Sequence, residues 1–82
     1  MVDGYKVYPN PTTGSFIVEI PTTENGAVVT VMDMLGKVIE TKSTNGNSKQ
    51  QVTFNIGQFA RGSYMVKVNS GAVTFRQKIE LW

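Results

Sequence analysis

The stretch Phe59-Ala60-Arg61-Gly62-Ser63-Tyr64-Met65-Val66-Lys67-Val68 determines the fold that we predict for this chain. In its second half, Tyr64, Val66 and Val68 share one face. A period of two is typical of a β-strand with one buried face. Gly62, just ahead of the alternation, predicts a tight bend at the start of the strand. We therefore expect a central strand here, in which Tyr64 is a core tyrosine whose hydroxyl reaches a polar partner.

Similar short runs, separated by Gly, Pro and Asn turns, extend along the chain. The strands expected from them are residues 5–8, 16–20, 27–32, 37–41, 50–56, 63–68 and 73–81. The inward positions of the second and fifth strands are Phe16, Val18, Ile20, Val52, Phe54 and Ile56. Val29 and Val31 are the most apolar positions of the third strand, and Val73, Phe75, Ile79 and Leu81 share one face of the last strand with a break at Gln77. No stretch has the period of a helix. The pattern predicts an all-β fold, a seven-stranded antiparallel immunoglobulin-like β-sandwich that forms one domain over residues 1–82.

The connections between these strands carry specific turn signals. Residues 9–11, Pro-Asn-Pro, lack two backbone donors and predict a rigid bend after a first edge strand. Asp33 and Gly36 predict a type I turn with a bulge, which is the usual three-residue hairpin loop. We expect residues 57–62 to make one helical or 3₁₀ turn that presses its aromatic residue onto the core. Residues 43–48 are all small or polar and predict the most mobile loop.

Composition limits the functions open to the chain. Eight Lys and Arg against six Asp and Glu give a net charge of +2, which is too small and dispersed to indicate binding to nucleic acid or an anionic membrane. The sequence has no Cys and no His, and so it lacks disulfides, thiol chemistry and the commonest general base and metal ligand. We expect its scattered carboxylates to be solvated: Glu19, Glu24, Asp33, Glu40 and Glu80. These features predict no enzyme, no metal and no cofactor.

Four pieces of the sequence follow one another in a characteristic order. They are Tyr8-Pro9-Asn10-Pro11 with Gly14, Val31-Met32-Asp33-Met34-Leu35-Gly36-Lys37-Val38, residues 56–64 ending in Arg61-Gly62-Ser63-Tyr64, and residues 65–79. Together they resemble the C-terminal sorting domain of type IX secretion in Bacteroidetes bacteria, and the resemblance covers nearly the whole chain. That family usually finishes with an apolar pair and a basic residue, whereas this chain finishes Glu80-Leu81-Trp82.

The resemblance implies a sorting domain at the end of a larger secreted protein, covalently attached to an upstream cargo domain. The first four residues have neither a basic region nor an apolar run, so any export signal is expected on that parent. The resemblance implies recognition by an outer-membrane translocon after the parent reaches the periplasm. A surface sortase-like peptidase then removes the domain and leaves the cargo at the cell surface or in the medium. Strand addition at an exposed edge is one mode of recognition, and the same edge predicts a weak homodimer.

The resemblance also assigns recognition to particular positions. They are Pro9, Asn10, Pro11, Asp33, Gly36, Lys37, Gly62, Tyr64, Val66, Lys67, Val68, Lys78 and Ile79. Turn chemistry alone explains Asp33 and Gly36, whereas Lys37 has no such local explanation. A second interpretation stays open: a non-catalytic accessory module of a secreted enzyme, either a spacer or a carbohydrate-binding domain. It is suggested by the aromatic residues near the two ends, Tyr5, Tyr8, Phe16 and Trp82.

Overall fold

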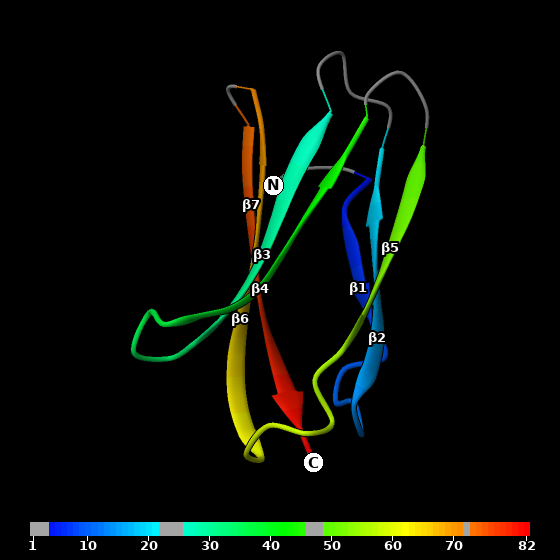
Figure 1. Ribbon diagram of the computed structural model, residues 1–82. Coiled ribbons are helices and arrows are strands. Elements are labelled where there is room, and N and C mark those ends of the chain that lie inside the picture. Colours follow the sequence, from blue (N-terminus) through cyan, green and yellow to red (C-terminus); the bar gives the residue numbers. More distant parts are fainter. Residues whose placement is uncertain (1–3, 22–25, 46–48, 72) are drawn as a thin grey trace.

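The computed structural model describes residues 4–21, 26–45, 49–71 and 73–82. Seven β-strands and no helix are present in this part of the chain (Figure 1). The strands are β1 (Lys6–Tyr8), β2 (Ser15–Ile20), β3 (Ala27–Asp33), β4 (Val38–Thr44), β5 (Gln50–Asn55), β6 (Gly62–Ser70) and β7 (Val73–Leu81). The predicted all-β fold is therefore confirmed. The described residues form no helix that is long and apolar enough to cross a membrane.

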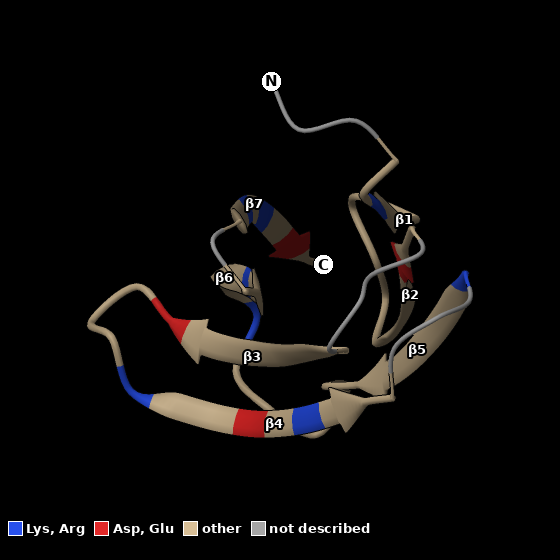
Figure 2. Ribbon diagram, turned by 90° about the horizontal axis from the view of Figure 1, so that it is seen from above, with Lys and Arg blue, Asp and Glu red and all other residues tan. Residues whose placement is uncertain are grey.

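The strands form two antiparallel sheets that face each other as a sandwich (Figure 2). One sheet has the order β1-β2-β5, and the other has the order β4-β3-β6-β7. Strands that are distant in the chain therefore pair, namely β2 with β5 and β3 with β6. This arrangement is consistent with the immunoglobulin-like sandwich that the sequence predicted. The predicted central strand is β6, which lies between β3 and β7.

The core lies between the sheets and is built from alternating positions on each strand. On β2, Phe16, Val18 and Ile20 all point inward and are at most 1 % exposed. Phe16 stacks on Phe54 of β5 with ring centroids 5.5 Å apart. Burying one such side chain contributes about 1.5–3 kcal/mol. The complete set of buried apolar side chains among the described residues is Phe16, Val18, Ile20, Ala27, Val29, Val31, Val52, Phe54, Ile56, Tyr64, Val66, Val68, Ile79 and Leu81.

Tyr64 closes the crossing from β5 to β6. Its ring is buried, and its hydroxyl donates a hydrogen bond to the backbone carbonyl of Ala60, as the sequence predicted for an unspecified partner. This contact is the tyrosine corner of immunoglobulin-like folds. The crossing makes one turn, as predicted, closed by a bond of 3₁₀ spacing from the Phe59 N–H to the Ile56 carbonyl at 3.0 Å. Phe59 is half-buried against the core, as expected.

Strand β4 is longer than predicted at its C-terminal end. Ser43 and Thr44 continue the ladder, opposite Val28 and Ala27. The Thr44 hydroxyl accepts a hydrogen bond from the Ala27 N–H at 3.0 Å, which accounts for the extension of the strand into the predicted loop. Residues 46–48 of that loop lie outside the described residues.

Strand β6 is also longer than predicted, and β7 follows it after a tight turn. Ser70 pairs with Val73, so β6 continues beyond residue 68, where the strand was predicted to end. We divide β7 into an upper half, residues 73–77, and a lower half, residues 78–81. Val73 lies on the same face of β7 as Phe75, Ile79 and Leu81, as predicted, and it is 39 % exposed.

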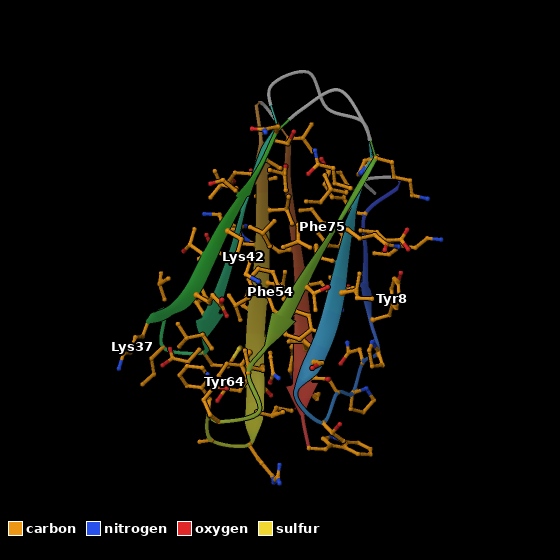
Figure 3. The ribbon with its side chains drawn as sticks, turned by 45° about the vertical axis from the view of Figure 1, so that its right-hand side comes forward. Tyr8, Lys37, Lys42, Phe54, Tyr64 and Phe75 are labelled. Carbon is orange, nitrogen blue, oxygen red and sulfur yellow. The ribbon has the colours of Figure 1, made fainter. Side chains whose placement is uncertain are left out.

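The exposure of Val73 follows from unequal cover along β7. In the lower half, Ile79 and Leu81 are 0 % and 2 % exposed. Strand β1 lies on the same side of the sandwich as β7 (Figure 2). The segment that follows it bonds, through Asn10 and Thr12, to Lys78, Glu80 and Trp82. In the upper half, Phe75 (labelled in Figure 3) stacks on Tyr5 with ring centroids 5.1 Å apart, and both side chains are half-buried against the core.

Candidate recognition surfaces

Four of the residues that the resemblance assigns to recognition are core residues. Tyr64, Val66, Val68 and Ile79 are at most 6 % exposed. A folded domain does not present such side chains to a partner, so their contribution is to form the fold. Gly62 begins β6 with a φ of +144°, a backbone conformation that favours glycine, and so it acts as the predicted bend.

The connection between β3 and β4 is the predicted three-residue hairpin. The Gly36 N–H donates to the Asp33 carbonyl at 3.0 Å, and Gly36 has a φ of +88°. The Asp33 Oδ1 atom accepts the backbone N–H groups of Leu35 and Lys37, each at 2.9 Å. Asp33 and Gly36 therefore have the turn roles that their spacing predicted. The Lys37 side chain has no part in these turn bonds.

A second irregularity redirects one side chain of β4. The register shifts after Val31, which pairs with Glu40, because the next residue, Met32, pairs with Val38. Ile39 is therefore the extra residue of a β-bulge, a feature that commonly re-aims a side chain. Ile39 is half-buried and packs against the core at this end of the sandwich.

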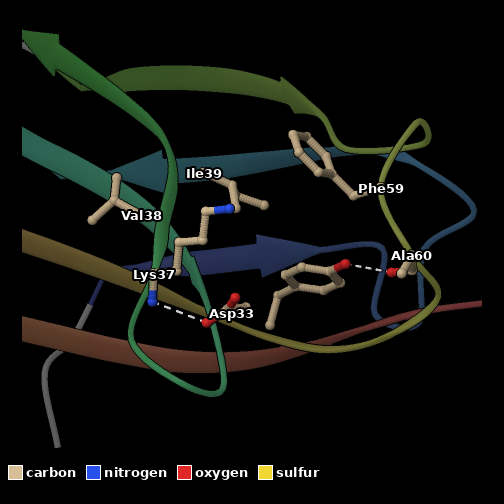
Figure 4. A pocket seen from close by; sticks show the side chains of 7 residues that line it. Asp33, Lys37, Val38, Ile39, Phe59 and Ala60 are labelled. Atoms are coloured by element: carbon tan, nitrogen blue, oxygen red, sulfur yellow. Dashed lines mark hydrogen bonds between the residues drawn. The ribbon is translucent and has the colours of Figure 1, made fainter.

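Ile39 lines a cavity of about 380 Å³, which we call the hairpin pocket (Figure 4). Its lining residues come from the β3–β4 hairpin and the β5–β6 crossing: Asp33, Lys37, Val38, Ile39, Phe59, Ala60 and Tyr64. Ile39 and Phe59 give it an apolar wall, and Lys37 places an ammonium group at its rim. This combination fits a partner that presents an apolar side chain beside an acidic group.

The hairpin also exposes apolar side chains around this pocket. Leu35 is 96 % exposed, Met34 is 55 % exposed and Val38 is 53 % exposed. A single exposed apolar residue needs no explanation, but three within five positions beside a pocket form a patch that is suited to contact with another protein.

The Pro-Asn-Pro segment lies along the outer edge of β7. Asn10 Nδ2 donates to the Lys78 carbonyl, and Asn10 Oδ1 accepts the Glu80 N–H, each at 3.0 Å. The Thr12 N–H donates to the Glu80 carbonyl at 2.8 Å, and the Thr12 carbonyl accepts the Trp82 N–H at 2.9 Å. The lower half of β7 is thus paired on both of its edges. The segment joins the first sheet to the last strand of the second.

Lys67 and Lys78 lie on the outer face of the four-stranded sheet. Lys67 is directly opposite Arg76, and Lys78 is opposite Met65 (Figure 2). The Lys78 ammonium lies 3.3 Å from the Glu80 carboxylate. Among the described residues, neither Lys67 nor Arg76 takes part in an ion pair.

Glu19 was predicted to be solvated, but it belongs to a polar network on the outer face of the three-stranded sheet. Its side chain is 13 % exposed, and its Oε2 atom accepts hydrogen bonds from the Tyr8 hydroxyl and from Gln51 Nε2. Lys49 Nζ lies 3.6 Å from the other carboxylate oxygen. Glu19 reaches Gln51 because the register of β2 and β5 places these two residues opposite each other. The hydrogen bond from Tyr8 lowers the pKa of Glu19, and the same bond raises the pKa of Tyr8.

The aromatic residues near the chain ends do not make a flat exposed row. Phe16 is buried, Tyr5 stacks on Phe75, and Tyr8 is bound to the Glu19 network (Figure 3). Trp82 alone of these is largely exposed, at 68 %. The described residues also contain no group of three or more His, Cys, Asp or Glu side chains placed to hold a metal ion.

The profile of one protein family, described as "secretion system C-terminal sorting domain", matches residues 6–81, which span all seven strands. The chain belongs to this family. The resemblance drawn from the four sequence pieces is thereby confirmed. This sorting domain is also 35 % identical over 63 residues to the endo-acting ulvan lyase of Formosa agariphila. The aligned part is 77 % of this chain but 12 % of the lyase, so the sorting domain corresponds to a small part of that relative.

The sequence did not reveal which residues give the sorting domain its surfaces. Ile39 and Phe59 of the hairpin pocket were expected only as strand and core residues. Asn10 was assigned to recognition, but its hydrogen-bond partners on β7 were not predicted. One signal was present in the sequence: Met34-Leu35 is an apolar pair within the predicted hairpin loop.

Proposed function

We propose that this chain is a C-terminal secretion signal domain that directs an upstream cargo protein through the type IX outer-membrane translocon. The family match over residues 6–81 carries this proposal, because it includes every strand of the sandwich. In this proposal the domain passes through the periplasm, and a sortase-like peptidase then removes it from the cargo. The cargo finishes at the cell surface or in the medium, and residues 1–82 serve as an address and not as a catalyst.

The translocon, in this proposal, contacts the outside of the folded domain. The buried positions of the motif, such as Val66 and Val68, are 0 % exposed and act by maintaining the fold. The hairpin pocket is the best-supported contact, because it combines a cavity, an exposed apolar patch and the ammonium of Lys37. Lys37 is also the assigned residue for which the turn gives no local reason. The Pro-Asn-Pro segment acts indirectly, by holding the lower half of β7 in place.

Export of a fused reporter tests this function. Residues 1–82 are appended to a periplasmic reporter in a bacterium that has the type IX machinery, and the reporter is measured in the medium and on the cell surface. We expect export with the domain and periplasmic retention without it. If the fusion stays in the periplasm while a native sorting domain exports the same reporter, the proposal is wrong. The accessory-module interpretation instead predicts retention together with glycan binding that is lost in Tyr8→Ala or Trp82→Ala.

Matched surface variants test the contact surface. Val38→Gln in the hairpin pocket and Val28→Gln on β3 both replace an exposed valine, 53 % and 41 % exposed respectively. We expect Val38→Gln and Leu35→Gln to lower export at unchanged thermal stability, because they remove apolar contact area from the patch. Val28→Gln is expected to export normally. Equal export by all three variants would show that the hairpin is not the contact surface, without affecting the secretion proposal itself.

A further inference from the structure

The outer edge of the upper half of β7 is an open strand edge in the part of the chain that the structure describes. Along β7, backbone groups point alternately toward β6 and away from it. Glu80 directs its N–H and C=O outward, to Asn10 and Thr12. The same alternation directs the N–H and C=O of Thr74 and Arg76 outward. Within the described part of the chain, no hydrogen bond reaches those groups, and β7 has only β6 as a neighbour in its sheet.

The other edges of the sandwich are better protected. On the opposite side, β4 and β5 approach each other, and Lys42 Nζ donates to the Thr53 carbonyl at 2.5 Å. The same ammonium lies 5.0 Å from the centre of the Phe54 ring (Figure 3). Strand β1 is three residues long and is followed at once by Pro9, which limits pairing at that edge. Among the described residues, the upper half of β7 has neither a lysine that bridges its outer edge nor a proline that limits pairing there.

The outer face beside this open edge carries uncompensated positive charge. Lys67 and Arg76 are cross-strand partners at a position where Arg76 does not bond β6, and side chains are closest at such pairs. Like charges placed directly opposite each other destabilise a sheet. Lys78 adds a third cation on the same face, partly balanced by Glu80 at 3.3 Å. The isolated domain therefore has an arrangement that an acidic partner would stabilise.

The inner face of the same edge is apolar at Val73 and Phe75, with the polar Gln77 below them. Val73 is 39 % exposed, and Phe75 is half-buried under Tyr5. The two faces of the edge thus differ in chemistry. A strand added beside β7 would alternate in the same way, with one set of side chains meeting cations and the other set meeting apolar surface.

We propose that the upper half of β7 binds an extended segment of a partner protein, which adds to the four-stranded sheet with acidic side chains outside and apolar side chains inside. Backbone hydrogen bonds supply affinity, and Lys67 and Arg76 select the charge of the partner. A second copy of this chain is a poor occupant of this edge, because it would place the same cations against each other. The proposal goes beyond the secretion function and concerns binding by the isolated chain.

Titration of the ¹⁵N-labelled 82-residue chain with synthetic peptides tests the proposal by NMR. The probe is an eight-residue peptide that alternates glutamate and valine, and its control has lysine in place of each glutamate. We expect the acidic peptide to bind with a Kd of about 0.1–1 mM, with the largest shifts and slowed exchange at the Thr74 and Arg76 amides. The lysine peptide is expected not to bind. Absence of binding by the acidic peptide at millimolar concentration, or shifts centred elsewhere, would overturn the proposal.

Charge variants provide the second readout. Arg76→Gln and Lys67→Gln remove cations beside the edge, and Lys6→Gln removes a cation from the other sheet. Because an exposed ion pair is worth little, we expect each of the first two to weaken binding of the acidic peptide about two- to fivefold. Lys6→Gln is expected to leave it unchanged. An equal loss in all three variants would show that only net charge matters and would contradict a specific edge site. Failure of the reporter fusion to be exported would contradict the secretion proposal, but it would not change the interpretation of this peptide-binding experiment.

Discussion

The two halves of β7 belong to one strand and have one partner in the sheet, but their outer edges differ. The lower half is paired by Asn10 and Thr12 through four hydrogen bonds of 2.8–3.0 Å. The upper half has no such neighbour among the described residues. Burial follows the same division, since Ile79 is 0 % exposed and Val73 is 39 % exposed. Asn10 and Thr12 thus protect one half of an edge strand, and no described residue pairs with the outer edge of the other half.

This difference separates the residues that form the fold from those that are available to a partner. Natural sheets protect their edges because an open edge pairs readily with another chain. Here the protected half contains Ile79, a buried residue of the family motif, and the open half lies beside the cations Lys67 and Arg76. A signal domain needs both properties, because it has to fold by itself and still be recognised by another protein.

The largest expected effect is on the buried residue of the lower half. Ile79→Ala removes a fully buried side chain, and we expect it to lower the free energy of unfolding by about 2–5 kcal/mol. Val73→Ala, at the exposed end of the same strand, is expected to cost less than about 1 kcal/mol. Urea denaturation measures both values. Similar costs for the two variants would show that the halves do not differ in burial.

A smaller effect is expected when the side-chain link to the lower half is removed. Asn10→Ala deletes two exposed hydrogen bonds, and we expect a loss of about 1 kcal/mol. Exchange of the Glu80 amide should become about fivefold faster, while that of the Arg76 amide stays the same. Asn69→Ala is the matched control, because its side chain only accepts a bond from Thr74. Equal changes in both variants would show that Asn10 does not hold β7.

The smallest effect is expected away from β7, in the Glu19 network. Tyr8→Phe removes the hydroxyl that lowers the pKa of Glu19 below its ordinary value of 4.5. A lowered carboxyl pKa stabilises the fold above pH 4.5 and loses that effect as pH falls through the lowered pKa. The raised pKa of Tyr8 stabilises the fold below pH 10.0 and loses that effect as pH rises through the raised pKa.

The difference in melting temperature between the native chain and Tyr8→Phe should therefore be constant from about pH 5 to 9 and smaller outside that range. Thermal melts across pH check this. A difference that does not depend on pH would mean that the Tyr8 hydroxyl does not act through Glu19. The exchange rates of the β7 amides should be the same in both chains.

The alternation of apolar residues was enough to predict the strands and most of the core, because burial of one face is a local property of each strand. It did not show that Val73 would be 39 % exposed while Ile79 on the same face is fully buried, because cover by another part of the chain is not a local property. It also missed the bulge that directs Ile39 into the hairpin pocket. Asn10 and Glu19 illustrate the same point. Their partners are distant in the chain, so only the closed sandwich shows that one pairs with β7 and the other joins a network.

Native-state amide hydrogen exchange along β7 tests the central comparison most directly. The outward N–H groups of Glu80 and Trp82 are bonded to Asn10 and Thr12, and those of Thr74 and Arg76 have no partner in the described structure. We expect the Glu80 and Trp82 amides to exchange at least about tenfold more slowly than the Thr74 and Arg76 amides, relative to their intrinsic rates. Equal protection of all four amides would mean that the upper half of β7 is already paired, and it would contradict this account.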